Sequence, residues 1–534
     1  MAFLRPLAAV LGLWCFCPLI APRCEALEAP ARPSKADDFI SRANRLYADI
    51  APNHRSDLVL LPALAKMDTP PRALATLETA AITPASSATF KELADWASAP
   101  NQQAVIKALQ AVTKDGDWHD AFAFGQPYGA DDIPPELVRA KLYTELGDPA
   151  TLAAAQFLYI PALDRMMWLV NVEATRLAAQ GKPNDAIDLL IHAVFFARQM
   201  CDRQFAKESL WGMEHASQLL ERARDVAYVA SLATDGGLSN DAIIEEVKRL
   251  DERTGFLDIS RIGFPQADRI AGEQIIARVF DRQGKPDERI FASTLARLGA
   301  TDHPLRLFSE AARWKSVAGS QASAADNKAK LEGFYDDWSS RWIIDPLEPR
   351  NQLPTVYSQF GSERSTMAAV NACVWNESEL FDARQIMRVE AAGTREALSL
   401  IGYKLAYKNF APQIQAIRPR WMEYLDADPF NPNRARGARP PLEYFVPVRD
   451  TQKGADGQGE PARIDIVPAD ARNAFARTFR DETFILYSWG SNNQKDFARR
   501  AQNTAAKADG ADYLLWPPMI SLYRQHLLDQ GQLK

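Results

Sequence analysis

Apolar residues recur at spacings of three and four along most of the chain between residues 39 and 350. This spacing is that of one buried face of an α-helix. Residues 183–200, PNDAIDLLIHAVFFARQM, carry a stripe formed by Ala186, Leu189, Ala193, Phe196 and Met200. Pro183 suits a first helical turn, where a backbone N–H has no partner within the helix. The pattern predicts a helical body over residues 39–350.

A second helical run, residues 168–181, precedes this one and ends at Gly181. Glycine is common just past a helix C-terminus because it adopts the left-handed conformation without strain. Helix, Gly-Lys-Pro, helix is typical of an antiparallel hairpin, and its small residues resemble one tetratricopeptide-type unit. No convincing array follows at the period of about 34 residues. We therefore expect a mainly α fold, an irregular helical stack with one tetratricopeptide-like hairpin.

Proline and glycine clusters mark the breaks between larger units, at residues 124–135, 345–354 and 450–461. The last of these three segments is typical of a mobile loop. We expect a connecting segment over residues 351–384 and a different module over residues 385–534.

The last quarter of the chain changes from helical spacing to short runs rich in aromatic and β-branched residues. Residues 393–412 predict an amphipathic helix. PLEYFVPV (441–448) and TFILYSWG (483–490) predict two strands, and DGADYLLWPP (509–518) closes the unit. A small α+β module is the expected result.

This order of elements resembles the globular domain of the major pseudopilins of type II secretion. The resemblance covers about a quarter of the chain and is shared with uncharacterised exported bacterial proteins whose larger part is helical. Its residues form a Tyr-x-Leu helix end, an Asp-Pro-aromatic turn, a Tyr-Ser strand end and an acidic closure with tryptophan. They are Tyr403, Leu405, Phe410, Asp428, Pro429, Phe430, Tyr487, Ser488, Gly490, Asp512 and Trp516.

Two departures from that family change what the resemblance implies. Pseudopilins begin with a processed apolar helix that packs into a fibre, whereas DARQIMRVEAA precedes residue 393 here. The resemblance therefore implies a shared pseudopilin-like module and not a fibre subunit. The glycine and proline that follow the helix in the family are replaced by Lys408 and Ala411.

In the pseudopilins the loop after the Tyr-Ser strand binds calcium through acidic side chains and carbonyls, as a hard cation requires. The resemblance implies a calcium site formed by Asp509 and Asp512, with Asn492 and Asp496 on the other side. Residues 497–508, FARRAQNTAAKA, form an insertion between the two halves. The alternative is a solvated loop whose aspartates cap turns.

The N-terminal segment has the three parts of a secretory signal peptide. Arg5 precedes an apolar run over residues 7–21, and the small residues of Cys24-Glu25-Ala26 suit cleavage. The apolar run is too short for a comfortable membrane span. We expect residues 1–26 to be removed and residues 27–38 to form a flexible leader. The protein is then periplasmic or extracellular, and an uncleaved anchor is the alternative.

The cysteines and the net charge limit which bonds and partners the mature protein can have. Cleavage leaves two of the five cysteines, Cys201 and Cys373, which either form a disulfide or remain buried thiols. The formal net charge of −6 gives no global basic field for nucleic acid. No later run approaches 18 apolar residues, so we expect no membrane span after cleavage. The loop with Arg434, Arg436 and Arg439 either meets phosphate or acidic lipid, or is simply solvated.

Catalytic motifs are mostly missing from the sequence. The six histidines show no metal-ligand spacing, and Glu214 and His215 are adjacent on a helix, so they point about 100° apart. No Gly-x-Ser-x-Gly elbow, phosphate-binding glycine loop or Cys-x-x-Cys occurs. One aromatic face, formed by Phe334, Trp338 and Trp342, either stacks on sugars or belongs to the core.

Two functions follow from these patterns. The first is a non-enzymatic exported envelope protein, with a helical docking body for an envelope or secreted protein and a structural or interaction module. The alternative is an exported hydrolase or lyase that acts on an envelope polysaccharide. Two carboxylates facing each other across a deep aromatic-lined groove favour the enzyme, and a continuous helical surface favours docking.

Overall fold

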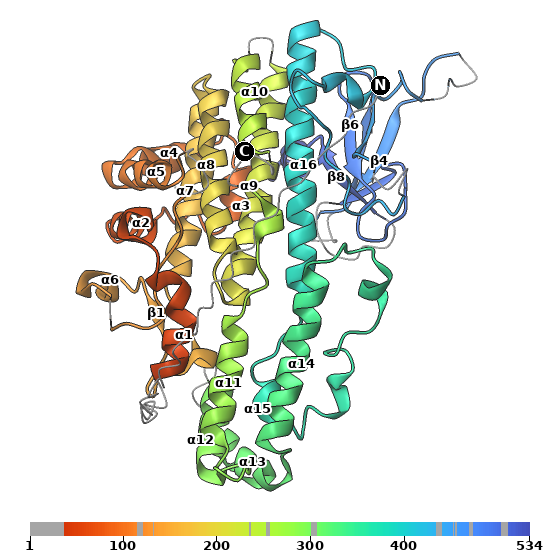
Figure 1. Cartoon of the computed structure of the whole chain (residues 1–534). Coiled ribbons are helices and arrows are strands. Elements are labelled where there is room, and N and C mark those ends of the chain that lie inside the picture. The colour runs from red at the N-terminus through yellow and green to blue at the C-terminus, as the bar shows by residue number, and fades with distance from the viewer. Residues whose placement is uncertain are drawn as a thin grey trace, which may run out of the picture.

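The protein is mainly helical, with a six-stranded mixed sheet and a final helix in its C-terminal part (Figure 1). A computed structural model describes residues 37–114, 121–131, 133–233, 236–251, 257–300, 307–433, 440–451, 453, 457–468, 474–502 and 511–533. The predicted signal peptide and most of the predicted leader lie outside these residues. In the described part of the chain, no helix has the length and apolar character that crossing a bilayer requires.

The α-helices in the first half of the chain are α1 (Asp37–Ala48), α2 (Asp57–Leu64), α3 (Leu77–Ile82), α4 (Phe90–Ser98), α5 (Pro100–Val112), α6 (Pro135–Arg139), α7 (Ile160–Ala179), α8 (Pro183–Cys201) and α9 (Ala206–Leu232). Those that follow are α10 (Asn240–Arg249), α11 (Ala267–Val279), α12 (Glu288–Ala300), α13 (Leu307–Val317), α14 (Ala324–Trp342), α15 (Ala368–Asn371), α16 (Ser378–Tyr407) and α17 (Met519–Asp529). The strands are β1 (Thr144–Glu145), β2 (Gln156–Phe157), β3 (Glu443–Phe445), β4 (Ala462–Ile466), β5 (Phe475–Phe479), β6 (Ile485–Ser488), β7 (Arg500–Gln502) and β8 (Asp512–Trp516).

The predicted hairpin of helices is present as α7 and α8. Gly181, between them, has a φ of +76°, the left-handed conformation expected after a helix C-terminus. Next in the chain, α9 packs closely on α8 at Gly212, where a Cβ atom would lie 2.6 Å from the Ala197 carbonyl oxygen. Only glycine fits this crossing without a shift of the backbone. The tetratricopeptide likeness of the hairpin stays a prediction.

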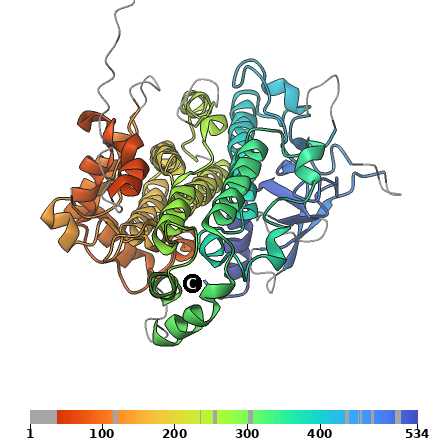
Figure 2. The same ribbon diagram turned by 60° about the horizontal axis from the view of Figure 1, so that its bottom comes forward.

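Helix α16 lies between the helical body and the sheet (Figures 1 and 2). It runs through residue 385, where the sequence predicted the C-terminal module to begin. Residues 389–402 are buried without interruption, so the expected amphipathic face is absent there. The reason is that α9 and α10 cover one side of α16 and strands β6 and β8 cover another.

The sheet has the strand order β3-β6-β8-β7-β4-β5 and is mixed. Strands β7 and β8 are parallel, as are β4 and β7, and the other pairs are antiparallel. The predicted strands at 441–448 and 483–490 are found as the shorter β3 and β6. Residues 500–502 of the segment predicted as a loop insertion form β7 in the middle of the sheet, so this part of it is a strand and not a loop. Such parallel pairing leaves no hairpin signal in the sequence.

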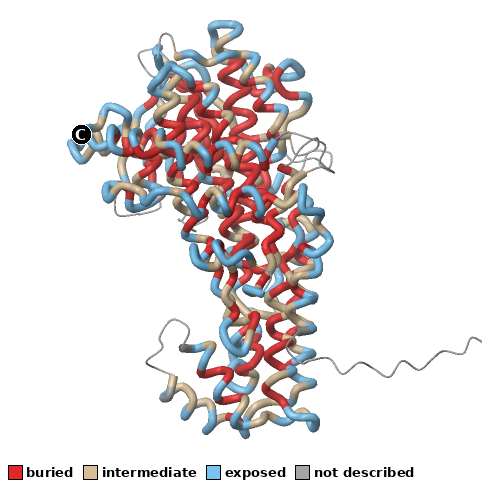
Figure 3. The backbone as a smooth tube through the Cα atoms, turned by 90° about the vertical axis from the view of Figure 1, so that its left-hand side faces the viewer, coloured by how far each residue is buried: buried red, intermediate tan, exposed pale blue. Residues whose placement is uncertain are grey.

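The central strands β6 and β8 are buried on both faces, whereas the outer strands β4 and β5 alternate between buried and more exposed residues. Leu486, Leu515 and Trp516 belong to the large core of the helical body. On the other face Ile485 and Leu514 form a second cluster with side chains of α17. A strand that is covered on both faces reads as a continuous apolar run, which explains the YLLW pattern of β8. Figure 3 shows the buried residues running through the thick part of the molecule.

A buried ion pair ties helix to helix and helix to sheet. Arg224 of α9 lies 2.6 Å from the Glu390 carboxylate of α16, and it donates from Nε to the Leu515 carbonyl oxygen at 3.0 Å. The Tyr513 hydroxyl of β8 donates to Glu390 at 2.6 Å. The C-terminal sheet is therefore joined to the body by polar as well as apolar contacts.

Candidate functional site

The residues of the Asp-Pro turn and of the Tyr-Ser strand end meet at one edge of the sheet. Asp428 is fully buried, and its Oδ1 accepts hydrogen bonds from the Ser488 hydroxyl at 2.7 Å and the Phe430 N–H at 3.0 Å. Its Oδ2 accepts from the Trp489 N–H at 3.1 Å. Burial raises the pKa of Asp428. The turn and the strand end are thus locked together by one carboxylate.

Asp512, at the start of β8, organises the loop that precedes β7. Its side chain is fully buried and accepts from the N–H groups of Asp496 at 3.1 Å and Ala498 at 2.6 Å. Burial raises the pKa of Asp512 to about 7. Within this loop Asn493, Phe497 and Ala498 have φ between +54° and +58°. The hydrogen bonds to Asp512 help to hold this strained backbone, since each left-handed residue costs about 1 kcal/mol.

The four predicted calcium ligands have separate outcomes. Asp512 directs both oxygens to backbone N–H groups, and Asn492 Oδ1 accepts from the Gln494 N–H at 3.0 Å. Asp496 lies close enough to Asp512 for its charge to contribute to the raised pKa of that carboxyl. Asp509 lies outside the described residues. Among the described residues no group of three acidic, histidine or cysteine side chains is arranged to hold a metal ion, so calcium binding stays a prediction.

The predicted aromatic face belongs to the core. Phe334 and Trp338 are fully buried and Trp342 is 4% exposed. The ring of Trp342 is covered: the Arg384 guanidinium carbon lies 4.2 Å from its centroid, and the rings of Phe264 and Phe381 make edge contacts at 5.5 Å and 5.0 Å. A sugar ring therefore has no open tryptophan face to stack on here.

Two other candidate groups give no ligand site. Cys201 and Cys373 are both buried free thiols, so the disulfide alternative is not found. Burial raises the pKa of each thiol to about 12, which makes both poor nucleophiles. The loop carrying Arg434, Arg436 and Arg439 lies outside the described residues.

One hydroxyl, imidazole and carboxylate set resembles a catalytic triad, but it lacks the required chemistry. Thr113 Oγ lies 2.9 Å from His192 Nδ1, and His192 Nε2 lies 3.6 Å from the Asp188 carboxylate. Thr113 is 1% exposed, and its single hydroxyl proton is donated to the Leu109 carbonyl oxygen at 2.7 Å. The imidazole cannot then take that proton as a general base, and no substrate reaches the oxygen.

A cavity of about 620 Å³ opens beside the C-terminal end of α14. This volume lies in the range typical of ligand sites, roughly 300–1,000 Å³. The lining comes from three places: the turn 259–261 and the segment after it, residues 339–346, and one face of α16. Its charged lining residues are Arg261, Asp345, Arg384 and Arg388.

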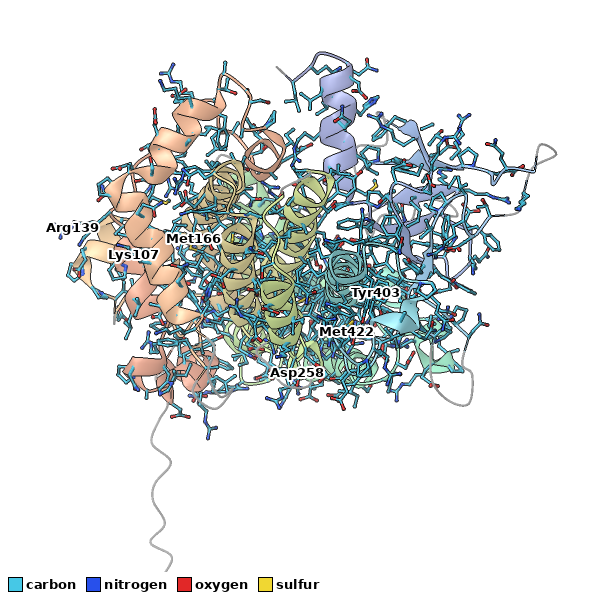
Figure 4. All side chains as sticks on the ribbon, turned by 90° about the horizontal axis from the view of Figure 1, so that it is seen from above. Lys107, Arg139, Met166, Asp258, Tyr403 and Met422 are labelled. Carbon is cyan, nitrogen blue, oxygen red and sulfur yellow. The ribbon has the colours of Figure 1, made fainter. Side chains whose placement is uncertain are left out.

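The arginines of this cavity differ in their roles. Arg384 is 5% exposed and donates to the Trp342 carbonyl oxygen at 2.6 Å, so it closes the end of α14. Arg388 lies one turn further along α16 and is only partly buried. Arg261 is half exposed and lies 2.8 Å from the carboxylate of Asp258, which is labelled in Figure 4. Arg261 and Arg388 are the less buried arginines of the cavity, and Arg388 Nη1 also donates to Gln385 Oε1 at 3.4 Å.

Sequence reasoning missed this cavity. Its walls come from segments far apart in the chain, and three single arginines make no motif. The only local signal was the proline-rich break that begins at Asp345, just after the aromatic stripe.

Comparison with known proteins adds no relative to this picture. No protein-family model matches the chain, and neither a curated protein nor a solved structure matches it.

Proposed function

We propose that the chain is a non-enzymatic exported protein of the cell envelope, and that it docks a partner protein at the end of α14. The C-terminal module serves as a structural support for α16. The observation that carries this proposal is the character of the cavity at that end. It is basic and bordered by an exposed apolar side chain, because Ile343 is 82% exposed. An apolar centre with a polar rim is the usual anatomy of a protein interaction site.

The enzymatic alternative finds less support at the same place. Glycoside hydrolysis needs two carboxyl groups roughly 5 to 10 Å apart on either side of the substrate. Among the described residues that line the cavity, Asp345 is the only acidic one. Its Oδ1 accepts from the Leu347 N–H at 2.9 Å, as in a turn. An arginine-rich cavity with one aspartate favours binding over hydrolysis.

Site-specific cross-linking in cells tests the docking proposal. A photoreactive residue at Ile343 or at Leu353, which is 62% exposed, should form an adduct with one envelope protein. Leu232, at the end of α9 and 58% exposed, is the matched control and should form none. Equal adducts at all three positions, or none at Ile343 and Leu353, contradict docking at this site. Release of sugar fragments from envelope polysaccharide by the purified protein supports the enzyme instead.

Export is a separate part of the proposal and has its own test. N-terminal sequencing of the mature protein should begin between Leu27 and Pro30 if the segment 1–26 is cleaved. A chain that keeps Met1 in the cytosolic fraction contradicts export, and one that keeps it in the membrane fraction supports the anchor.

A further inference from the structure

The charges at the cavity mouth come from two separate elements. Arg261 ends the turn Ile259–Arg261, and Arg388 projects from α16 into the same cavity. Guanidinium groups bind carboxylates through paired, charge-assisted hydrogen bonds. The pair between Arg261 and Asp258 is largely exposed on the arginine side, and such pairs contribute little stability, so an incoming carboxylate can compete for this arginine.

The apolar part of the site lies on the segment that follows α14. Ile343 lines the cavity and has the highest exposed fraction among the large apolar side chains that the structure describes as exposed. Arg341 holds the neighbouring segment against this helix end, because its guanidinium donates to the carbonyl oxygens of Arg350 and Leu353. Ile343 directly follows Trp342, whose carbonyl oxygen accepts a hydrogen bond from Arg384, so its side chain lies beside the arginines at a hydrogen-bonded helix end.

The combination of charges and an aliphatic surface discriminates between ligands. An acidic glycan supplies carboxylates but no aliphatic side chain for Ile343, and Trp342, which is covered by Arg384, Phe264 and Phe381, offers a sugar ring no open aromatic face. A peptide supplies carboxylates and aliphatic side chains at neighbouring positions. Arginine is a frequent hot-spot residue of protein interfaces, and complementary charge contributes to the specificity of such contacts.

Building on the docking function proposed above, we propose that the cavity binds an acidic peptide segment of the partner protein. Carboxylates of this segment lie against Arg261 and Arg388, and one of its aliphatic side chains lies against Ile343. Arg384 is a positioning residue, since it closes α14 and thereby fixes the wall that carries Ile343.

Fluorescence anisotropy with the full-length protein tests this proposal. The probe is a fluorescein-labelled hexapeptide, Glu-Leu-Glu-Glu-Leu-Glu, and its matched control has glutamine in place of every glutamate. The acidic peptide should bind and the glutamine peptide should not. Because each charge reversal replaces an attraction to the peptide's carboxylates with a repulsion, Arg388→Glu and Arg261→Glu should each weaken binding at least roughly tenfold. Binding should also weaken as ionic strength rises.

Two further variants separate the site from a general charge effect. Arg463→Glu reverses an exposed arginine on β4, whose side chain is 74% exposed, and should leave the affinity unchanged. Ile343→Ser should weaken binding of the acidic peptide without changing its salt dependence. Thermal melting is the check that each variant is folded. Arg384 is not substituted, because its loss would disturb the end of α14.

Parallel titrations with inorganic phosphate, oligogalacturonate and vesicles containing phosphatidylglycerol identify a different ligand class. Binding of any of these without binding of the acidic peptide overturns the proposal, as does peptide binding that survives both charge reversals. If the peptide fails while the Ile343 cross-link still forms in cells, docking stands and its acidic occupant is wrong. If both fail, the docking function itself is wrong.

Discussion

Arg524 of α17 and Asp225 of α9 form a two-point ion pair across 299 residues of sequence, with N–O distances of 2.8 Å and 2.6 Å. Asp225 is fully buried, forms a second ion pair with Arg222, and accepts a hydrogen bond from the Ser521 hydroxyl. Burial by itself raises the pKa of Asp225, but the charges of Arg524 and Arg222 bring it down to about 2. The pair therefore fastens the last helix to the body.

Replacing Arg524 with methionine should lower the free energy of unfolding by about 3 kcal/mol, because a buried carboxylate loses a charged partner. Urea denaturation at neutral pH measures this loss. Arg477→Met is the matched control, because it removes a second ion pair to the same helix. Arg477 of β5 pairs with Asp529 of α17 at 2.6 Å, but this aspartate is 46% exposed, so we expect a much smaller loss. Equal losses of unfolding free energy in the two variants would show that burial of the ion pair does not determine its contribution to stability.

The close crossing of α8 and α9 predicts opposite effects for two glycine-to-alanine changes. In Gly212→Ala the new Cβ would meet the Ala197 backbone oxygen at 2.6 Å, so we expect a loss of about 1–3 kcal/mol despite the better helix propensity. At Gly333, within α14, a new Cβ would meet no atom within 4 Å, so Gly333→Ala should gain up to about 1 kcal/mol. Calorimetric melting of both variants measures these changes in stability. A gain of stability in both variants would contradict the close crossing of α8 and α9.

Lys408 adopts a left-handed conformation directly after α16, with φ +59° and ψ +12°. This is one of the positions where the pseudopilin pattern has glycine. Lys408→Gly should raise the free energy of unfolding by about 1 kcal/mol, since glycine takes this conformation without strain. Lys408→Ala keeps the strain and removes only the charge, so it should show no such gain. A gain of the same size in alanine would assign the effect to charge.

Asp268 predicts a pH dependence of stability. Its Oδ2 accepts from the Ala206 N–H at 2.8 Å, and burial raises its pKa to about 7 from an ordinary value of 3.8. A raised pKa means that the folded state holds the proton more tightly, so this contribution is complete below about pH 4 and is lost as pH rises to about 7. Asp268→Asn keeps the acceptor and removes the titration. The fall in unfolding free energy between these pH values should be smaller in the variant, and an unchanged profile would contradict it.

Calcium binding at the 490–498 loop can be tested apart from the fold. If the resemblance to pseudopilins extends to the ion, millimolar calcium should raise the melting temperature relative to chelator by an amount equivalent to about 1 kcal/mol. Asp496→Asn should abolish this shift with little change in the chelator baseline. Asp512→Asn should instead lower the baseline, because Asp512 holds the N–H groups of Asp496 and Ala498. If calcium does not shift the melting temperature of the wild type, the loop does not bind the ion.

Local signals explain which parts of the fold were predictable. The α7–α8 hairpin has an apolar stripe, a glycine stop and a proline start within a few dozen residues. The aromatic residues of α14 repeat at helical spacing, and of their two open interpretations the core is the correct one. Both cases depend on neighbours in sequence, which is the information that periodicity contains.

The parts that were missed depend on partners distant in sequence. Helix α16 is apolar on more than one side because a sheet formed later in the chain covers it, and one helix has no period that reveals this. Strand β7 pairs in parallel with residues 465–466 and 512–513, so no turn announces it. The cavity likewise joins Arg261 to Arg388 through tertiary packing alone.

The attachment of α17 also governs the order in which this polypeptide can reach its native state. Arg524 donates to the carbonyl oxygen of Ala81, next to the end of α3, a contact that spans 443 positions. Contacts of such long range form slowly because a large loop must close first. During synthesis α3 leaves the ribosome early, and the part of it that contacts α17 stays exposed until residues 519–529 have been made. Chaperone demand during synthesis, and rapid degradation of chains that stop short of α17, are the expected cellular costs of this arrangement.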